Sequence, residues 1–155
     1  MSVNVKIVGL NRLTKLAERY PATSEKYVGT AIQRALTRIL GQEKQEAPFG
    51  VSGMLRDNWR ITTGRFEGAL VSLTPYASYV HDGTAPHMPP VKELEAWAKK
   101  KGISPWAVAM SIKKKGTKAN PFLQRSVDEV KDGIESDFEK ALNDALNELA
   151  ALDDA

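Results

Sequence analysis

The chain has 155 residues, 42% of them hydrophobic and 26% charged, a composition typical of a globular protein. We expect one domain over residues 1–155, large enough to bury roughly 70% of its unfolded surface. The absence of cysteine excludes disulfides, thiolate metal sites and a cysteine nucleophile, and is in keeping with a reducing cytoplasm. We expect neither a membrane span, because no apolar run approaches about 18–20 residues, nor a signal peptide.

Basic and acidic residues are unevenly distributed along the chain. Residues 1–127 carry 20 basic and 9 acidic side chains, a net charge of +11, whereas residues 128–155 carry 2 basic and 10 acidic, a net charge of −8. Such a split favours a role for charge in orienting either a neighbouring copy or a polyanion. A solvated acidic helix at the C-terminal end explains the pattern equally well.

The N-terminal part predicts a strand followed by two helices. Apolar and polar residues alternate over 3–7, as in a half-buried strand, and leucines at helical spacing over 10–17 predict a short helix that ends at Pro21. A longer helix, with a threonine or serine cap at 23–24, carries an apolar stripe and runs to Pro48. Two glycines inside it predict close packing against a neighbouring element: Gly29 and Gly41.

The middle of the chain predicts a β-hairpin and a short helical turn. After a loop over 47–54, alternating residues over 59–63 and 69–73 predict two antiparallel strands. The run 75–90 then predicts a helical turn that ends at Gly83 and a proline-rich loop, which we expect to project from the body for assembly. Two tyrosines are expected to anchor this turn in the core: Tyr76 and Tyr79.

The last third predicts three helices. Pro90 begins one helix and Ser104 caps a second, which ends at Gly116, so residues 90–116 form a helical hairpin. Apolar residues recur every three or four positions over 122–152 and predict a final helix about 45 Å long, which often finds part of its partner surface on another chain. The expected class is α+β, with helices packed on a small, mostly antiparallel sheet of three to four strands.

Motifs for catalysis and metal binding are weak. The chain has two histidines, His81 and His87, and Asp82 adjoins the first, but their spacing matches no zinc motif. No nucleophile elbow surrounds Ser52, and no glycine-rich phosphate loop precedes a Lys-Ser or Lys-Thr pair. We therefore expect no enzymatic activity, no metal and no cofactor.

The predicted helical hairpin is strongly basic. Residues 88–118 contain eight lysines and two glutamates, accompanied by Trp97 and Trp106. One interpretation is a patch that binds nucleic-acid phosphates, without the side chains needed to read bases. The other is that lysines solvate the helix ends, where the helix dipole favours them, and that the tryptophans pack in the core. Six lysines are candidate phosphate contacts: Lys99, Lys100, Lys101, Lys113, Lys114 and Lys115.

Short sequence pieces occur in an order typical of one family. They are VKIVGL at 5–10, Ala-Pro at 47–48, SGMLR at 52–56, YASYVHDGT at 76–84 and PFL at 121–123. In these pieces the chain resembles the head–tail joining proteins (tail-completion, neck or connector proteins) of long-tailed double-stranded DNA phages and prophages.

The chain departs from this family at two residues and by its helical hairpin. His81 stands where an acidic residue is usual, and Arg125 where proline is frequent, whereas the hairpin 90–116 is shared with a subset of prophage relatives. The resemblance implies a non-enzymatic virion protein, assembled in the host cytoplasm, that forms a ring of six copies in the neck. Such a ring joins the DNA-filled head to the tail, between the portal–adaptor side and the tail-tube or tail-terminator proteins. Genome DNA passes through without sequence-specific binding, and no membrane is involved.

Three surfaces are expected to contact neighbours: the 81–90 loop, the basic hairpin and the acidic last helix. A basic body and an acidic helix are complementary faces for a ring, although the acidic helix could instead line the DNA channel. The alternative function is a small basic DNA-binding protein that uses residues 90–116. Phe122 and Leu123 are expected either in the core or docked into an adjacent subunit. The candidate interface residues are Tyr79, His81, Asp82, Thr84, His87, Met88, Phe122, Leu123 and Phe138.

Overall fold

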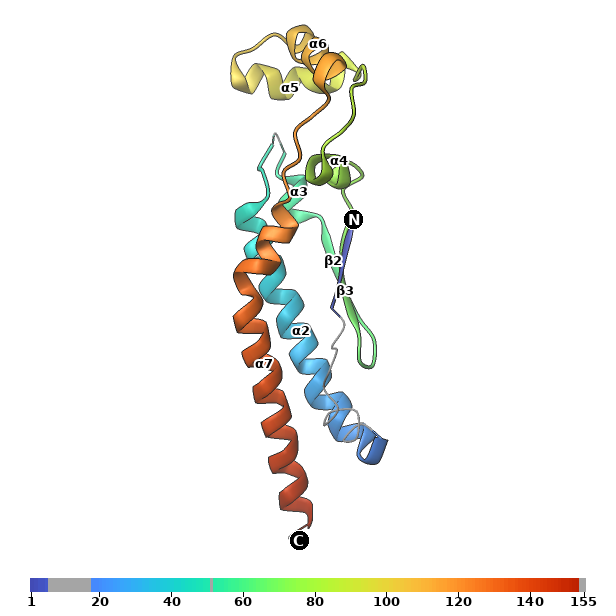
Figure 1. The fold of residues 1–155 in the computed structure, drawn as a ribbon, viewed down its shortest axis with the longest axis vertical. Coiled ribbons are helices and arrows are strands. Elements are labelled where there is room, and N and C mark those ends of the chain that lie inside the picture. The colour runs from blue at the N-terminus through green and yellow to red at the C-terminus, as the bar shows by residue number, and fades with distance from the viewer. Residues whose placement is uncertain (6–17, 51, 154–155) are drawn as a thin grey trace.

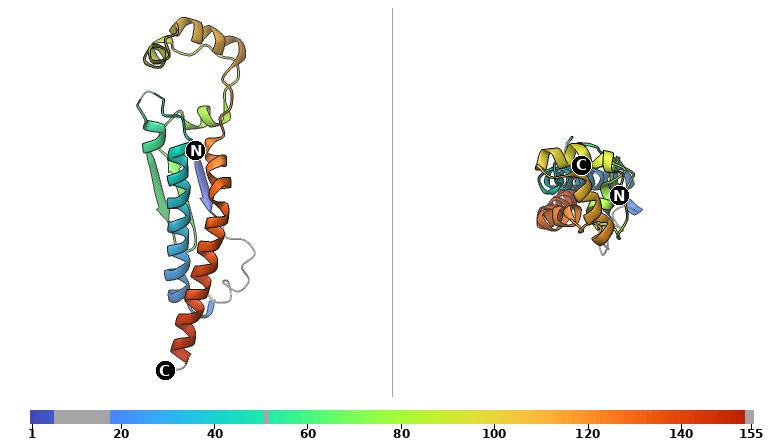
Figure 2. Two further views of the ribbon diagram at one scale, coloured as in Figure 1. Left: turned by 90° about the vertical axis from the view of Figure 1, so that its left-hand side faces the viewer. Right: turned by 90° about the horizontal axis from the view of Figure 1, so that it is seen from above.

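Two long antiparallel helices form the main axis of the molecule (Figure 1). The computed structural model describes residues 1–5, 18–50 and 52–153 of the chain. Helix α2 spans Pro21–Glu46, and α7 spans Phe122–Asp153. The two helices pack along their length, which gives the molecule its elongated shape (Figures 1 and 2). Within the described residues, no helix is both long enough and apolar enough to cross a membrane.

A small antiparallel sheet packs against α2. Strands β2 (Trp59–Thr63) and β3 (Gly68–Ser72) form the predicted hairpin, and the short β1 (Ser2–Val5) pairs along the other edge of β3. The strand order is therefore β1-β3-β2. The α+β class and the long C-terminal helix are confirmed. The described residues hold no fourth strand, so the upper end of the predicted strand number is not reached.

The core lies between α2, α7 and the sheet. The apolar face of α2 meets Leu70 of β3 and the first turn of α7 because apolar residues recur at three- and four-residue spacing on both helices. Ala47 and Ala77 close the end of this core from the segments beside α3 (Met54–Asp57) and within α4 (Ala77–Asp82). The fully or almost fully buried members are Val28, Ile32, Leu36, Ile39, Ala47, Leu55, Leu70, Ala77, Phe122 and Leu123.

Ion pairs fasten the acidic helix α7 to the basic helix α2. Arg38 Nε lies 2.6 Å from Asp137 Oδ2, and Lys26 pairs with Glu148, near the far end of α7. The hydrogen bond from Arg38 holds the pKa of Asp137 below its usual value. Part of the charge asymmetry is thus satisfied within one molecule, and α2 provides the partner surface for the apolar stripe of α7.

A helical hairpin projects beyond the end of the α2–α7 pair. Helices α5 (Val91–Lys101) and α6 (Pro105–Lys115) form it, and we call residues 91–115 the arm (Figures 1 and 2). The Ser104 hydroxyl accepts a hydrogen bond from the backbone N–H of Ala107, as its predicted role as a cap requires. Two segments, 83–90 and 116–121, join the arm to the body, and we call them the stalk.

The start of the second helix was predicted incorrectly. Pro21 occupies the first turn of α2, with Tyr20 as the residue before the helix, so α2 begins ahead of the predicted cap at 23–24; residues 18–19 are helical, and that earlier helical stretch ends before Pro21 as predicted. Proline suits that position because its fixed φ is helical and its missing N–H would have no helical partner there. Ser24, a predicted cap, is buried inside α2. The predicted helix at 10–17 and the end of the predicted first strand lie outside the described residues.

Two packing predictions were also wrong, and one short helix was not predicted. A Cβ added at Gly29 or Gly41 would meet no atom within 4 Å, so neither glycine marks a close helix contact. Helix α3, which begins at Met54 at the end of the predicted loop over 47–54, is the helix that was not predicted. Tyr76 and Tyr79 are 42% and 63% exposed. Helix α4 instead turns the small side chain of Ala77 into the core, which leaves the phenol rings on its outer side.

Candidate interaction surface

The stalk is a short two-stranded connection. The backbone N–H of Thr84 donates to the carbonyl of Thr117, and the N–H of Thr117 donates to the carbonyl of Thr84, both at 3.1 Å. Their hydroxyl oxygens lie 3.0 Å apart. Gly116 has φ 71°, and a Cβ there would lie 1.9 Å from the Thr84 oxygen. Only glycine fits this crossing, so the stalk fixes the arm relative to α4.

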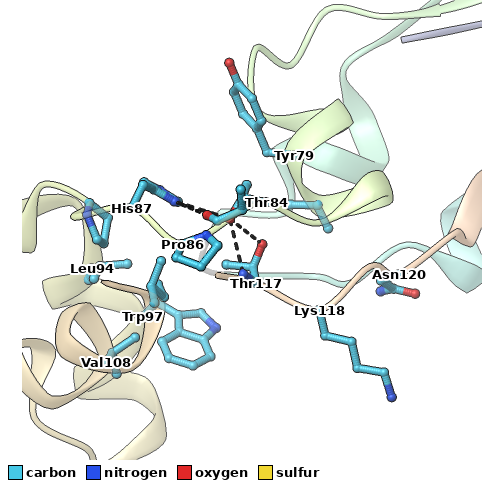
Figure 3. A pocket seen from close by; sticks show the side chains of 14 residues that line it. Tyr79, Thr84, Pro86, His87, Leu94, Trp97, Val108, Thr117, Lys118 and Asn120 are labelled. Atoms are coloured by element: carbon cyan, nitrogen blue, oxygen red, sulfur yellow. Dashed lines mark hydrogen bonds between the residues drawn. The ribbon is translucent and has the colours of Figure 1, made fainter. Parts of the chain in front are cut away.

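A groove of about 880 Å³ opens between α4, the stalk and the inner side of the arm (Figure 3). Leu94 and Trp97 from α5 and Val108 and Ile112 from α6 form its apolar wall on the arm. Tyr79 stands on the opposite side, in the middle of α4 (Figure 3). The remaining lining comes from the loop after α4 and the stalk: Val80, Thr84, Ala85, Pro86, His87, Pro89, Thr117, Lys118 and Asn120.

The apolar wall is uncovered because of how the two arm helices meet. Ala98 and Ala109 are the buried residues of α5 and α6, so the helices approach each other through small side chains. The larger apolar residues of the two helices remain partly or largely exposed: Leu94, Val108 and Ile112 are half-buried, and Trp97 and Trp106 are exposed. Trp97 is 37% exposed and Trp106 is 59% exposed, so the predicted packing of Trp106 in a core is wrong and that of Trp97 is only partial.

The two histidines belong to different parts of the surface. Nδ1 of His87 lies 3.0 Å from the Ala85 carbonyl oxygen and 3.4 Å from the Thr84 hydroxyl, at the edge of the groove. Nδ1 of His81 lies 2.7 Å from Asp82 Oδ1, and its ring stands edge-on to Phe122. His81 and Asp82 instead line a smaller hollow of about 300 Å³ beside the first residues of the chain.

These histidine contacts contribute to the loop structure on both sides of α4. His87 holds the turn that launches the arm, and His81 packs on the first residue of α7. In residues 1–5, 18–50 and 52–153, no three His, Asp or Glu side chains are grouped so that they could hold a metal ion.

The candidate phosphate contacts lie at the C-terminal ends of the two arm helices. Lysines 99–101 form the last turn of α5 and lysines 113–115 the last turn of α6, where the helix dipole favours cations. Lys100 is tied to the body, because its Nζ donates to the Gly50 carbonyl at 2.9 Å and lies over the Phe49 ring. All six lysines are exposed, so positive charge is concentrated at the C-terminal ends of α5 and α6.

The predicted interface residues fall into two groups. Tyr79, Thr84 and His87 line the groove, and Met88 beside them is 44% exposed. The second group, Phe122, Leu123 and Phe138, belongs to the core of a single copy. These side chains therefore expose little or no surface with which to contact a neighbour. Phe122 is 0% exposed, Leu123 is 4% exposed, and Phe138 packs half-buried against the core cluster.

One buried titratable group was missed in the sequence. Glu43 of α2 is fully buried, and neither carboxylate oxygen has a hydrogen-bond partner among the described residues. Burial raises the pKa of Glu43 to about 7, against weaker opposing effects of Trp59, Lys44 and Arg56. The signal was present, because residue 43 continues the buried stripe of α2 one turn after Ile39.

The groove wall could also have been inferred from spacing. Leu94 and Trp97 on one helix, and Val108 and Ile112 on the next, mark one apolar face on each helix of the hairpin. The sequence pattern shows the faces but cannot show whether the body covers them.

Comparison of the chain with protein-family models, with curated proteins and with solved structures finds no match.

Proposed function

We propose that this protein is a structural component of a phage neck, which assembles into a ring and joins the DNA-filled head to the tail. The ordered family pieces support this role, and one structural observation carries it. A projecting arm presents an apolar groove and exposed tryptophans that the body leaves uncovered. Contiguous exposed apolar surface with a polar rim is typical of protein interaction sites.

The composition of the groove favours a macromolecular contact over catalysis. Its arm side is apolar, and the Thr84 and Thr117 hydroxyls are engaged with each other across the stalk. A small-molecule site usually has several polar groups that converge on the ligand. Apart from the two threonines, the polar side chains of the groove are Tyr79, His87, Lys118 and Asn120, and all four lie outside its apolar wall on the arm. The groove therefore suits a row of apolar side chains with charges beside it.

The proposed ring contains six copies between the portal–adaptor side and the tail-tube or tail-terminator proteins. A closed ring requires a heterologous interface, in which two different faces of the same chain meet. The basic arm and the acidic outer side of α7 supply two such faces. The central channel would carry genome DNA without base-specific contacts.

Particle composition and a gene deletion test this role. We expect the protein in purified virions, and we expect the deletion to yield DNA-filled heads and separate tails that the wild-type gene in trans restores to joined particles. A matched complementation with Trp97→Ser, a change in the groove wall, should restore joining poorly, whereas Trp106→Ser outside the groove should restore it. Absence of the protein from joined particles would refute the proposal.

DNA binding by residues 90–116 remains the second candidate, and the exposure of Trp106 favours it. Aromatic rings beside lysines can stack on bases while the cations contact phosphates. Fluorescence anisotropy with duplex and single-stranded DNA over a salt series separates the two functions. In such a series the logarithm of the binding constant falls with the logarithm of the salt concentration, with a slope of about −0.9 per phosphate contact. Tight binding with a steep slope, abolished on changing lysines 113–115 to glutamine, would favour a DNA-binding protein. Weak binding with a shallow slope fits a neck protein.

A further inference from the structure

The groove has a defined chemistry, and therefore a defined kind of occupant. Its wall of Leu94, Trp97, Val108 and Ile112 requires apolar side chains in an occupant. Lys118 in the lining, with the lysines in the last turns of α5 and α6 beyond it, favours negative charge beside them. An amphipathic helix that carries carboxylates next to an exposed apolar residue meets both requirements.

Such a helix surface exists in this chain. On the side of α7 away from α2, the residues Asp132, Glu135, Glu139, Asn143 and Leu146 follow one another at intervals of three or four. All five are exposed, and Leu146 is 42% exposed although it lies between the buried Ala145 and the ion-paired Glu148. We call these five residues the outer stripe.

The outer stripe cannot reach the groove of its own molecule. Helix α7 leaves the stalk at Phe122 and runs away from the arm, so the arm and the C-terminal end lie at opposite ends of the molecule (Figures 1 and 2). At roughly 1.5 Å per residue, Leu146 lies about 36 Å along the helix from its start. The ion pairs to α2, such as that between Arg38 and Asp137, hold α7 in this direction.

We propose that the groove of one copy binds the outer stripe of α7 of the next copy. This inference rests on the proposed assembly role and identifies the contact between neighbours. When each groove takes the stripe of a different neighbour, repetition of the contact gives a closed ring or an open filament. Apolar burial around Leu146 supplies the affinity, and attraction between the carboxylates of the stripe and the arm lysines sets the orientation.

The absence of cysteine makes a cross-linking test unambiguous. His87→Cys places a thiol at the edge of the groove, and Leu146→Cys places one on the outer stripe; both side chains are exposed, so the core is unchanged. Equimolar amounts of the two variants are mixed at about millimolar concentration and oxidised mildly. We expect the mixed disulfide to form at least about tenfold faster than with the matched control Gln33→Cys, an exposed position on α2, in place of Leu146→Cys. Equal rates would overturn the inference.

A charge exchange provides an independent test, with circular dichroism confirming that each variant is folded. Changing lysines 113–115 to glutamate should weaken self-association in sedimentation velocity, and so should changing Glu135 and Glu139 to lysine. A mixture of the two variants should regain association, because one copy's groove then meets a stripe of opposite charge again. Association that neither variant reduces, or that the mixture fails to regain, contradicts the proposed contact.

The same cysteine variants distinguish this inference from the proposed function. If both variants are incorporated into virions but the mixed disulfide does not form there, the neck role stands and the contact is wrong. If the disulfide forms in solution but the protein is absent from virions, the contact stands and the neck role is wrong. A disulfide from His87→Cys to a different acidic protein in the particle also refutes the contact between copies.

Discussion

The body and the arm of this molecule use their apolar residues differently. In the body, the large apolar side chains at the centre of the core, including Phe122, Ile32 and Leu36, are fully buried. In the arm, the buried positions of α5 and α6 are alanines, while Trp97 and Trp106 stay exposed. Burial of apolar area is the main stabilising contribution to a fold. The body therefore holds the structure together, and the arm retains apolar surface for a partner.

The arm is attached to the body by hydrogen bonds, whereas the body is held together by buried apolar side chains. The stalk joins the two through backbone hydrogen bonds between Thr84 and Thr117, and Lys100 adds one contact to the Gly50 carbonyl. These interactions set a direction but bury little apolar surface. A contact of this kind can position a binding surface at a distance from the body without contributing much to global stability.

Truncation of a core residue gives the largest expected difference between the two regions. Phe122→Ala should lower the free energy of unfolding by about 3–5 kcal/mol, because a fully buried ring is replaced by a cavity. Trp106→Ala, which removes a larger but exposed side chain from the arm, should change it by less than about 1 kcal/mol. Urea denaturation followed by circular dichroism measures both. Similar losses would show that the arm is part of the cooperative core.

The buried carboxyl group of Glu43 is the next most sensitive feature of the body. Its folded pKa of about 7 lies above the usual 4.5, so the folded state keeps a proton that the unfolded chain has lost between these pH values. Stability should therefore fall as the pH rises from 4.5 to 7 and level off above that, by up to about 3 kcal/mol.

Substitution by glutamine isolates this effect. Glu43→Gln should remove the pH-dependent loss, so the variant should be more stable than wild type at pH 8 and close to it at pH 4.5. The difference between the two denaturation curves removes the contribution of other carboxylates, such as Asp57 nearby. Glu46→Gln, on the same helix but half-buried and paired with Arg125, is the control and should keep the wild-type pH profile. Parallel curves for Glu43→Gln and wild type would contradict a raised pKa.

The body could be predicted from the sequence, and the environment of the arm could not. Periodic apolar residues determine which side of α2 and α7 is buried, and Gly83, Ser104 and Gly116 end or begin helices through local backbone preferences. Whether an apolar face is covered depends on contacts between elements far apart in the chain. Tyr79 and Trp106 were therefore misplaced, although the helices that carry them were predicted.

A substitution in the stalk tests whether the arm is held by backbone fit. Gly116→Ala would place a Cβ 1.9 Å from the Thr84 oxygen at φ 71°, which should destabilise the stalk by about 1–3 kcal/mol. Gly102→Ala is a matched control, because φ is 69° there and no atom lies within 4 Å of the added Cβ.

Hydrogen exchange separates a local effect from a global one. We expect Gly116→Ala to accelerate exchange in α5 and α6 and leave α2 and α7 protected, since the body does not depend on the stalk for its core. Gly102→Ala should show only the smaller cost of a left-handed alanine, confined to the turn between the arm helices. Faster exchange throughout α2 in the Gly116 variant would mean that arm and body unfold together.

The ion pairs between α2 and α7 should have the smallest effect. Arg38→Gln should cost about 0.2–1 kcal/mol at pH 7, because its guanidinium is half exposed although Asp137 is only 13% exposed. Hydrogen bonding from Arg38 lowers the pKa of Asp137, so the pair's contribution is present above the usual aspartate pKa and disappears as the pH falls through the lowered value. A double-mutant cycle with Asp137→Asn, measured at pH 7 and at acidic pH, should give a coupling energy that is largest at pH 7 and falls as the pH is lowered. A coupling energy that does not change with pH would mean that packing, and not charge, joins these two side chains.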